Sequence, residues 1–195
     1  MSPSLAGALQ FSVRAKAGLA SRWRNAYYKL LGVEINGYAW LRRIDIPRNF
    51  EDISLANGVA LDEGVVLLAS GAPNGKKKII IGEGTYINRS SFIDASDEIS
   101  IGRHVGIGPR CYITDHDHGT APDIQVLEQP LVSSPTTICD GVWLGANVIV
   151  LKGVTIGINT IVAAGSIVAR DLPSGVIAEG KPARPIKRRS ATHRS

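Results

Sequence analysis

A period of six residues runs without a gap from Ile138 to Pro173. The segment divides into the six units ICDGVW, LGANVI, VLKGVT, IGINTI, VAAGSI and VARDLP, and each unit opens with an aliphatic residue. This period does not fit an α-helix, because a helix repeats its apolar positions every three to four residues. It is typical of a parallel β-solenoid, in which each unit forms one short strand and one corner. The sequence therefore predicts an all-β fold built from hexapeptide repeats.

The same period extends towards the N-terminus. It runs as IGEGTY, INRSSF and IDASDE from Ile81, slips by two residues, and continues as IGRHVG and IGPRCY from Ile101. Nearer the N-terminus it is weaker, and the step of six is kept at Ile53, Val59 and Val65. Three units make one coil of triangular cross-section, so the opening residues are expected to fill the interior while backbone groups pair between coils. Glycine and asparagine at the corners tolerate the positive φ of tight turns.

Two stretches interrupt the repeat. The segment Asn74 to Lys78 contains three consecutive lysines and is predicted to be a charged turn whose lysines face solvent. Residues 114–137 show no period and are rich in polar residues and proline. A loop this long inside a regular array usually has a function. We therefore expect a solenoid domain over residues 51–187 with a loop at 114–137, an N-terminal helix and connecting segment over 1–50, and a basic disordered tail over 188–195.

One helix is predicted, over residues 4–31. Apolar residues recur there at helical spacing, and Gly32 stands where the helix would end. The apolar positions are Leu5, Leu9, Val13, Ala17 and Ala20, and basic side chains lie between them. A basic amphipathic helix lies on a membrane surface or, as an alternative, packs on the end of the solenoid and covers its exposed strand edges. The second interpretation is favoured.

Composition limits the other possibilities. The 195 residues carry a net charge of +5 that is concentrated at the two ends. No helix-turn-helix, zinc-finger or aromatic RNA-binding pattern accompanies this charge, so we expect no nucleic-acid partner. We also expect no transmembrane helix and no secretory signal, and hence a cytoplasmic protein, with the inner face of the membrane as an additional location. Cys111 and Cys139 form no CxxC pair and are expected to be reduced.

The repeat with its interrupting histidine loop resembles the left-handed β-helix acyltransferases. The motifs VWLGANVIVLKGVTIG, VAAGSIVARDLP and GKPARPIK carry the resemblance, which covers about residues 80–187. Within that family the chain is similar to sugar and polysaccharide O-acetyltransferases of the galactoside, maltose and colanic-acid types. The resemblance implies a left-handed parallel β-helix, a homotrimer, and acetyl-CoA as co-substrate for acetylation of a hydroxyl on a sugar, glycan or polysaccharide precursor. The N-terminal region departs from the maltose type, so the acceptor stays open.

Acetyl transfer to a hydroxyl needs a base, and the pKa of histidine, about 6.5, suits that role at neutral pH. His116 and His118 stand at the start of the loop, in TDHDHG. Counting from Ile101 with the spacing that the resemblance implies reaches His118, which is the favoured base. A local gap would give the role to His116 instead. Asp115 or Asp117 would orient the imidazole ring or contact the substrate.

The resemblance also implies further contacts. Asn88 matches an acceptor contact, and Trp143 matches a tryptophan that walls the pocket or stacks on a ligand. The family's acidic acceptor contact would fall near Ser96, where this chain has no carboxylate, although Asp94 and Asp97 are close. The acetyl-CoA arm would lie in a groove between subunits, along small residues, with its phosphates held by basic ones. The matching positions are Ala146, Ala164, Ala169, Arg170, Lys181, Arg184 and Lys187.

Other functions stay open. A serine or amino-sugar acetyltransferase is the alternative with the same chemistry. In a different class, γ-carbonic anhydrases share the solenoid and hold zinc with three histidines. That function would need His104 to join His116 and His118, whereas the unit IGRHVG places His104 at a corner, where we expect it on the surface. A non-catalytic scaffold is the third alternative. The favoured function, O-acetyl transfer, implies no metal.

Overall fold

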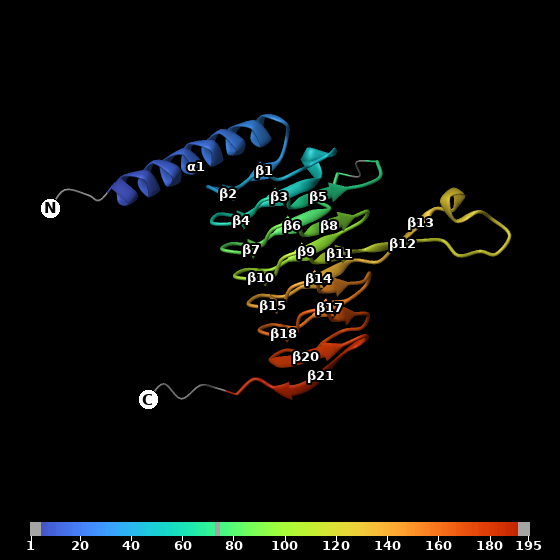
Figure 1. The fold of residues 1–195 in the computed structure, drawn as a ribbon. Coiled ribbons are helices and arrows are strands. Elements are labelled where there is room, and N and C mark those ends of the chain that lie inside the picture. The colour runs from blue at the N-terminus through green and yellow to red at the C-terminus, as the bar shows by residue number, and fades with distance from the viewer. Residues whose placement is uncertain (1–4, 73–74, 191–195) are drawn as a thin grey trace.

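The computed structural model describes residues 5–72 and 75–190, with the side chains of α1 described from Arg14 onward. A parallel β-solenoid makes up the molecule, with the helix α1 (Leu5–Leu30) across its N-terminal end and one loop projecting from its side (Figure 1). The chain passes from one sheet to the next, so strands that are neighbours in a sheet belong to successive coils. The all-β solenoid with one N-terminal helix, expected from the sequence, is confirmed.

Three sheets form the sides of the solenoid. The first sheet contains β1 (Glu34–Ile35), β3 (Ile53–Leu55), β6 (Ile79–Ile81), β9 (Ile99–Ile101), β14 (Thr136–Ile138) and β17 (Thr155–Ile156). The second contains β2 (Trp40–Leu41), β4 (Ala60–Leu61), β7 (Tyr86–Ile87), β10 (Gly106–Ile107), β15 (Trp143–Leu144), β18 (Ile161–Val162), β20 (Val176–Gly180) and β21 (Ala183–Arg188), of which the last pair is antiparallel. The third contains β5 (Val66–Ala69), β8 (Phe92–Ala95), β11 (Tyr112–Thr114), β16 (Ile149–Val150) and β19 (Ile167–Val168).

The residues that open the hexapeptides fill the interior. Between residues 138 and 173 all six are 0% exposed: Ile138, Leu144, Val150, Ile156, Val162 and Val168. They stack because the coils are in register, as where Ile107 lies beside Leu144. Side chains alternate along a strand, so the residue next to each opener points outward. Burial of each such aliphatic side chain contributes roughly 1.5–3 kcal/mol, which is why the period alone specifies the interior.

The helix α1 caps the N-terminal end of the second sheet. The Ser21 hydroxyl accepts the Leu41 N–H at 2.9 Å, and the Asn25 amide both accepts the Ala39 N–H at 3.1 Å and donates to the Ala39 carbonyl at 2.6 Å. Ser21 and Asn25 are both buried. Since β2 has a strand partner on one side only, α1 supplies hydrogen bonds that an edge strand would otherwise leave to water.

The expectation for the lysine turn is wrong at one residue. Lys78 is 1% exposed, and its ammonium lies 3.1 Å from a carboxylate oxygen of Asp52 in the 3₁₀ helix η1 (Phe50–Asp52). It also donates to the carbonyls of Ser70 at 2.7 Å and Ala72 at 2.9 Å. A buried charge needs a partner and further hydrogen bonds, and the turn bends back over Lys78 to supply them.

The segment without a period, residues 114–137, is an antiparallel ribbon rather than an unstructured loop. It contains β12 (His116–His118), η2 (Val126–Glu128) and β13 (Leu131–Ser133). At its tip the buried Gln129 side chain bonds to both backbone groups of Ala121 and to the Ile124 carbonyl. We call this segment the ribbon loop. It projects from the third sheet, on the right in Figure 1.

Both ends bear on the expected domain limits. Because β1 and β2 already pair with solenoid strands, regular structure starts before residue 51. The division into domains stays a prediction. Part of the predicted disordered tail, residues 191–195, lies outside the described residues. No helix in the described ranges is long and apolar enough to cross a membrane.

Candidate active site

His116 lies where the ribbon loop leaves the third sheet. Thr114, the last residue of β11, is in register with Asp94 of β8 in the preceding coil. Two residues later, His116 begins β12, with its side chain only 12% exposed. The end of β11 thus sets the imidazole beside β8, close to the solenoid surface rather than out in solvent.

Asp115 holds one side of the imidazole. The Nδ1 atom of His116 lies 2.8 Å from Oδ1 of Asp115. The Asp115 carboxylate is fully buried, and its two oxygens accept the backbone N–H groups of Ser96 and Asp97, each at 2.8 Å. A carboxylate with these donors acts as an acceptor towards His116, so Nδ1 carries the hydrogen and Nε2 keeps its lone pair. This tautomer is the one that a general base requires.

Asp94 lies on the other side of the imidazole. Its Oδ1 is 4.0 Å from Nε2 of His116, and its Oδ2 accepts the Tyr112 hydroxyl at 2.9 Å. Burial, together with the hydrogen bond to Asp94, raises the pKa of Tyr112, which stays a neutral donor. Oδ1 of Asp94 is buried and has no hydrogen-bond partner among the described residues. Such an atom is unfavourable unless a ligand supplies a donor.

The other loop candidates lie apart from this cluster. The His118 side chain is exposed, and its ring makes no hydrogen bond or ion pair within the described part of the chain. Asp117 forms an ion pair with Lys152, whose ammonium is 3.2 Å from Oδ2 and also donates to the Val132 carbonyl at 3.0 Å. Lys152 belongs to the following coil, so this pair ties the root of the ribbon loop to the solenoid.

Asn88 and Trp143 lie on a different side of the solenoid from His116. Asn88 follows β7 of the second sheet, where its side-chain oxygen accepts the Arg89 N–H at 2.8 Å. Trp143, in β15 of the same sheet, points outward and is 57% exposed. Because His116 belongs to the end of the third sheet, a single copy of the chain does not bring these two residues together with the imidazole.

The candidate cofactor residues are divided in the same way. Ala146 and Ala164 follow the second sheet in successive coils, and a Cβ added to Gly145 would lie 2.6 Å from the Ala164 nitrogen. Successive coils are therefore closely packed along this edge, and its small side chains protrude little from the backbone. Ala169 and Arg170 follow the third sheet and lie on another edge. Four basic candidates are exposed, with the last two in β21: Arg170, Lys181, Arg184 and Lys187.

Asp94 is the residue that sequence reasoning did not assign. It occupies an ordinary outward position, one residue after the buried Ile93, and only its register with Thr114 shows that it faces the loop root. His104 is exposed at its corner, as expected. In the described ranges, no group of three or more His, Cys, Asp or Glu side chains is placed to hold a metal ion. The three-histidine zinc site of the alternative function is therefore not assembled there.

The sequence matches known proteins over the repeat region. Residues 135–170 match the family model described as bacterial transferase hexapeptide (six repeats). The galactoside O-acetyltransferase of Lactococcus lactis subsp. lactis (strain IL1403) is 37% identical over 108 residues, which are 55% of this chain and 52% of that protein. The putative lipopolysaccharide biosynthesis O-acetyl transferase WbbJ of Escherichia coli (strain K12) is 34% identical over 122 residues, 58% of this chain and 62% of the relative.

A solved structure shows the same similarity. A hexapeptide-repeat-containing acetyltransferase of Vibrio cholerae O1 biovar eltor, complexed with acetyl coenzyme A, is 35% identical with a TM-score of 0.56. The match covers 59% of this chain and 62% of that one. The chain thus spans about half to three fifths of the length of these relatives. In its repeat and its fold, the chain is similar to hexapeptide-repeat acetyltransferases.

Proposed function

We propose that the protein transfers the acetyl group of acetyl-CoA to a hydroxyl of a glycan, with His116 as the general base. The observation that carries this proposal is the Asp115–His116–Asp94 cluster. Its imidazole is fixed through Nδ1 at 2.8 Å and turns Nε2 towards a buried carboxylate oxygen that lacks a partner among the described residues. The ordered, partnered ring favours His116 over the exposed His118, which the sequence spacing had preferred.

The proposed reaction uses these groups in one sequence. Nε2 of His116 removes the proton of the acceptor hydroxyl as that oxygen attacks the thioester carbonyl carbon. The tetrahedral intermediate then collapses, the C–S bond breaks, and the proton passes from His116 to the leaving thiolate, which gives an acetyl ester and free CoA. Asp115 orients the ring and stabilises its protonated form. The open oxygen of Asp94 accepts a second hydroxyl of the acceptor, which suits a sugar with neighbouring hydroxyls.

We propose that the complete site forms between copies of the chain, in a homotrimer. His116 belongs to the third sheet, whereas Asn88, Trp143 and the small residues Ala146 and Ala164 belong to the second sheet and the edge that follows it. A neighbouring copy can bring the two surfaces face to face. The ribbon loop supports this arrangement, because it projects from the solenoid with exposed apolar side chains at Ile124, Val126, Leu127 and Val132.

Acetyl-CoA fits the proposed groove chemically. The low edge at Ala146 and Ala164 suits close approach of an extended pantetheine arm. The exposed Lys181, Arg184 and Lys187 provide charge-assisted donors for its phosphates, and Arg170, which lies on another edge, can do so from a neighbouring copy. The relatives support this choice of substrates: one is named as a galactoside O-acetyltransferase, another as a putative lipopolysaccharide biosynthesis O-acetyl transferase, and a third was solved with acetyl coenzyme A.

A release assay for free CoA tests the proposal. Purified protein is incubated with acetyl-CoA and a panel of mono- and oligosaccharides, nucleotide sugars, serine and amino sugars, and thiol release is measured. We expect release with a glycan acceptor, and a fall in kcat/KM of roughly 10²- to 10⁴-fold in His116→Ala, because general-base catalysis is lost. His118→Ala is the matched control and should keep near wild-type turnover. Loss in His118→Ala with full activity in His116→Ala would overturn the assignment of the base.

We also propose that the outward face of α1 rests on an anionic membrane surface. Its exposed side chains recur at spacings of three and four and form one apolar stripe: Leu19 (60% exposed), Trp23 (78%), Tyr27 (54%) and Leu30 (86%). The opposite face carries Ser21 and Asn25, which bind Leu41 of β2 and the preceding Ala39. From Leu5 to Leu30 the sequence contains five basic residues and no acidic one.

The positive charge of α1 favours an anionic membrane over a second copy of the chain as the partner of this apolar stripe. A second copy packed against it would bring like charges together, since Lys16 and Arg22 lie beside the apolar residues and are exposed. Anionic lipid headgroups would instead neutralise them, with a contribution of about 1 kcal/mol per basic residue near the surface. Tryptophan and tyrosine also suit the boundary between headgroups and acyl chains.

A further inference from the structure

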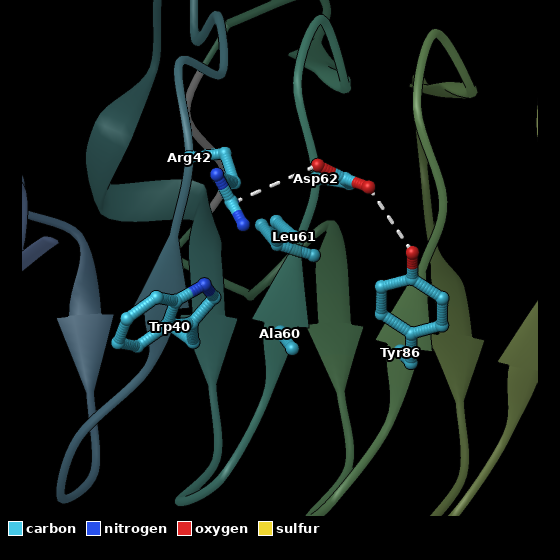
Figure 2. A pocket seen from close by; sticks show the side chains of 6 residues that line it. All are labelled: Trp40, Arg42, Ala60, Leu61, Asp62 and Tyr86. Carbon is cyan, nitrogen blue, oxygen red and sulfur yellow. Dashed lines mark hydrogen bonds and ion pairs between the residues drawn. The ribbon is translucent and has the colours of Figure 1, made fainter. Parts of the chain in front are cut away.

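A hollow lies on the outer face of the second sheet, near its N-terminal end. Trp40, Ala60 and Tyr86 are in register on the neighbouring strands β2, β4 and β7, and their inward neighbours are buried. The small side chain of Ala60 between two aromatic rings leaves a cavity of about 110 Å³ (Figure 2). Its lining is completed by Arg42, Leu61 and Asp62.

The wall formed by Trp40 is supported from behind by α1. A Cβ added to Gly18 would lie 3.9 Å from the Trp40 ring, so only about the width of one methyl group separates the helix backbone from the indole. Ser21 and Asn25 fix the strand that carries Trp40 through its neighbours Leu41 and Ala39. The position of the indole thus depends on both β2 and α1, and the hollow is part of the end of the solenoid that α1 caps.

The rim of the hollow offers both hydrogen-bond donors and acceptors. The Tyr86 hydroxyl donates to Oδ2 of Asp62 at 3.1 Å, and the Glu63 N–H donates to its Oδ1 at 2.8 Å. The guanidinium nitrogens of Arg42 and Arg89 are 3.9 and 3.7 Å from the Asp62 carboxylate, too far for hydrogen bonds (Figure 2 shows the Arg42 pair). Both guanidinium groups and the carboxylate therefore keep capacity to bind hydroxyl groups of a ligand.

The charge states of the rim residues are suited to binding hydroxyl groups. Burial opposes ionisation of Asp62, but the hydrogen bonds from Glu63 and Tyr86 and the charges of Arg89 and Arg42 outweigh it and lower the pKa of its carboxyl. Burial and the bond to Asp62 raise the pKa of Tyr86. At neutral pH the rim thus holds a carboxylate acceptor, a phenol and two guanidinium donors. A ring with apolar C–H faces and neighbouring hydroxyls, that is a pyranose, matches aromatic walls with such a rim.

The hollow is one part of a longer row. Along the outer face of the second sheet, large and small residues alternate in register: Trp40, Ala60, Tyr86, Gly106 and Trp143. Neighbouring strands are about 4.8 Å apart, so the aromatic rings recur about every 10 Å, a step that two linked pyranose units can span. The row leads from the hollow past Tyr86, next but one to Asn88 in the chain, to Trp143. Both Asn88 and Trp143 belong to the proposed active site.

We propose that this row is a glycan-binding track, in which the hollow between Trp40 and Tyr86 holds a pyranose unit of the acceptor that is distant from the acetylated one. The acceptor is accordingly an oligosaccharide or polysaccharide rather than a single sugar. The proposal rests on the proposed function for the identity of the ligand as acceptor. Binding itself can be measured without acetyl transfer.

The test fills the hollow. Ala60→Leu adds bulk at its centre without removing a contact, and Ser54→Leu makes a similar change on β3 of the first sheet in the same coil. Full-length wild-type protein and both variants are applied to an array of galactose, glucose, rhamnose and N-acetylglucosamine oligosaccharides of one to six units. We expect binding that strengthens with length, weakens roughly tenfold or more in Ala60→Leu and in Tyr86→Ala, and is unchanged in Ser54→Leu.

Two outcomes would overturn the track: no wild-type binding to any probe, or binding that Ala60→Leu and Tyr86→Ala leave unchanged. Thermal denaturation of the same proteins shows whether Tyr86→Ala still folds. If Tyr86→Ala does not fold, glycan binding by Ala60→Leu alone tests the track. Length-dependent binding that is lost in Ala60→Leu, in a protein that releases no CoA with any acceptor, supports the track and contradicts the proposed function. Acetyl transfer without glycan binding to the row supports the proposed function and contradicts the track.

Discussion

At the residue scale, the proposed chemistry depends on which oxygen or nitrogen of each side chain is left open. The His116 imidazole has one nitrogen committed to Asp115 and one free, and Asp94 has one oxygen committed to Tyr112 and one free. The two free atoms face each other at 4.0 Å. This complementarity distinguishes His116 from His118 and is the reason for the role proposed for Asp94, namely to accept a hydroxyl of the acceptor.

Replacement of Asp94 by asparagine tests that role. Asp94→Asn keeps the size of the side chain and an oxygen for Tyr112, but it removes the charged acceptor. We expect KM for the glycan acceptor to rise roughly 10- to 100-fold, because a hydrogen bond to a charged group contributes about 1.5–3 kcal/mol. KM for acetyl-CoA should not change. Steady-state kinetics with each substrate varied in turn gives both values.

The control for this substitution is Asp123→Asn, on the exposed tip of the ribbon loop. It makes the same chemical change away from the His116 site and should leave both KM values as in the wild type. An unchanged KM for the glycan in Asp94→Asn would rule out the proposed contact.

At the element scale, α1 has two faces with different tasks. One face completes the edge of β2 through Ser21 and Asn25, and the other exposes an apolar stripe. The buried face contributes to the stability of the fold, and the exposed face is available for a binding partner. Separate substitutions can therefore test the two without interference.

Asn25→Ala tests the capping face. The substitution leaves both backbone groups of Ala39 without the side-chain amide that now pairs with them. We expect the free energy of unfolding to fall by about 1–3 kcal/mol, as for buried polar groups that lose their partner. Chemical denaturation followed by circular dichroism measures it. Asn36→Ala, which removes an exposed side chain on the next segment, should stay within about 0.5 kcal/mol of wild type. Equal stability of the two variants would argue against the cap.

The exposed face is tested with lipid vesicles. Wild-type protein should sediment with vesicles that contain phosphatidylglycerol and not with pure phosphatidylcholine, and the bound fraction should fall as salt is raised, because the attraction is screened. Trp23→Ser with Leu30→Ser should abolish binding, since it removes the two most exposed apolar side chains of the stripe. Ile186→Ser, on β21 at the far end of the solenoid, is the control. Equal sedimentation with both lipids, or wild-type binding by the double variant, would contradict a membrane role for α1.

At the scale of the whole molecule, the proposed site requires more than one copy. A single solenoid presents His116 from the third sheet and Ala164 from the edge after the second, so each copy would contribute half of two different sites. The closed arrangement that follows is a ring of identical interfaces. A site shared between copies cannot be tested by any one substitution.

Mixed assemblies provide the test. His116→Ala removes the base, and Ala164→Trp fills the proposed cofactor groove, so each variant alone should be inactive. Co-refolding of the two in equal amounts should restore about a quarter of wild-type activity, because a random ring pairs an intact base with an intact groove at that frequency. Mass measurement in solution should give three copies for all three preparations. No recovery in mixed trimers would place the complete site within one copy.

The period of six determined, from sequence alone, the solenoid, its buried aliphatic residues and the position of the ribbon loop. It did so because strand, corner and burial repeat locally. The position of a residue within its own six-residue unit is enough to predict whether its side chain points inward. The helix followed from its own spacing in the same way, and is observed at Leu5–Leu30 where 4–31 was expected. The two histidine candidates came from the resemblance and from their place at the loop root.

The tertiary structure alone decided which side chains meet across coils. Asp94 and His116 are 22 positions apart in the chain, and Trp40 and Tyr86 are two coils apart; the register between coils, set by corners and insertions of unequal length, brings each pair together. Lys78 is a further example, since its burial depends on Asp52 and two carbonyls that the turn folds over it. A repeat specifies which way a side chain points. Contacts between coils depend on distances along the chain that a local period does not record.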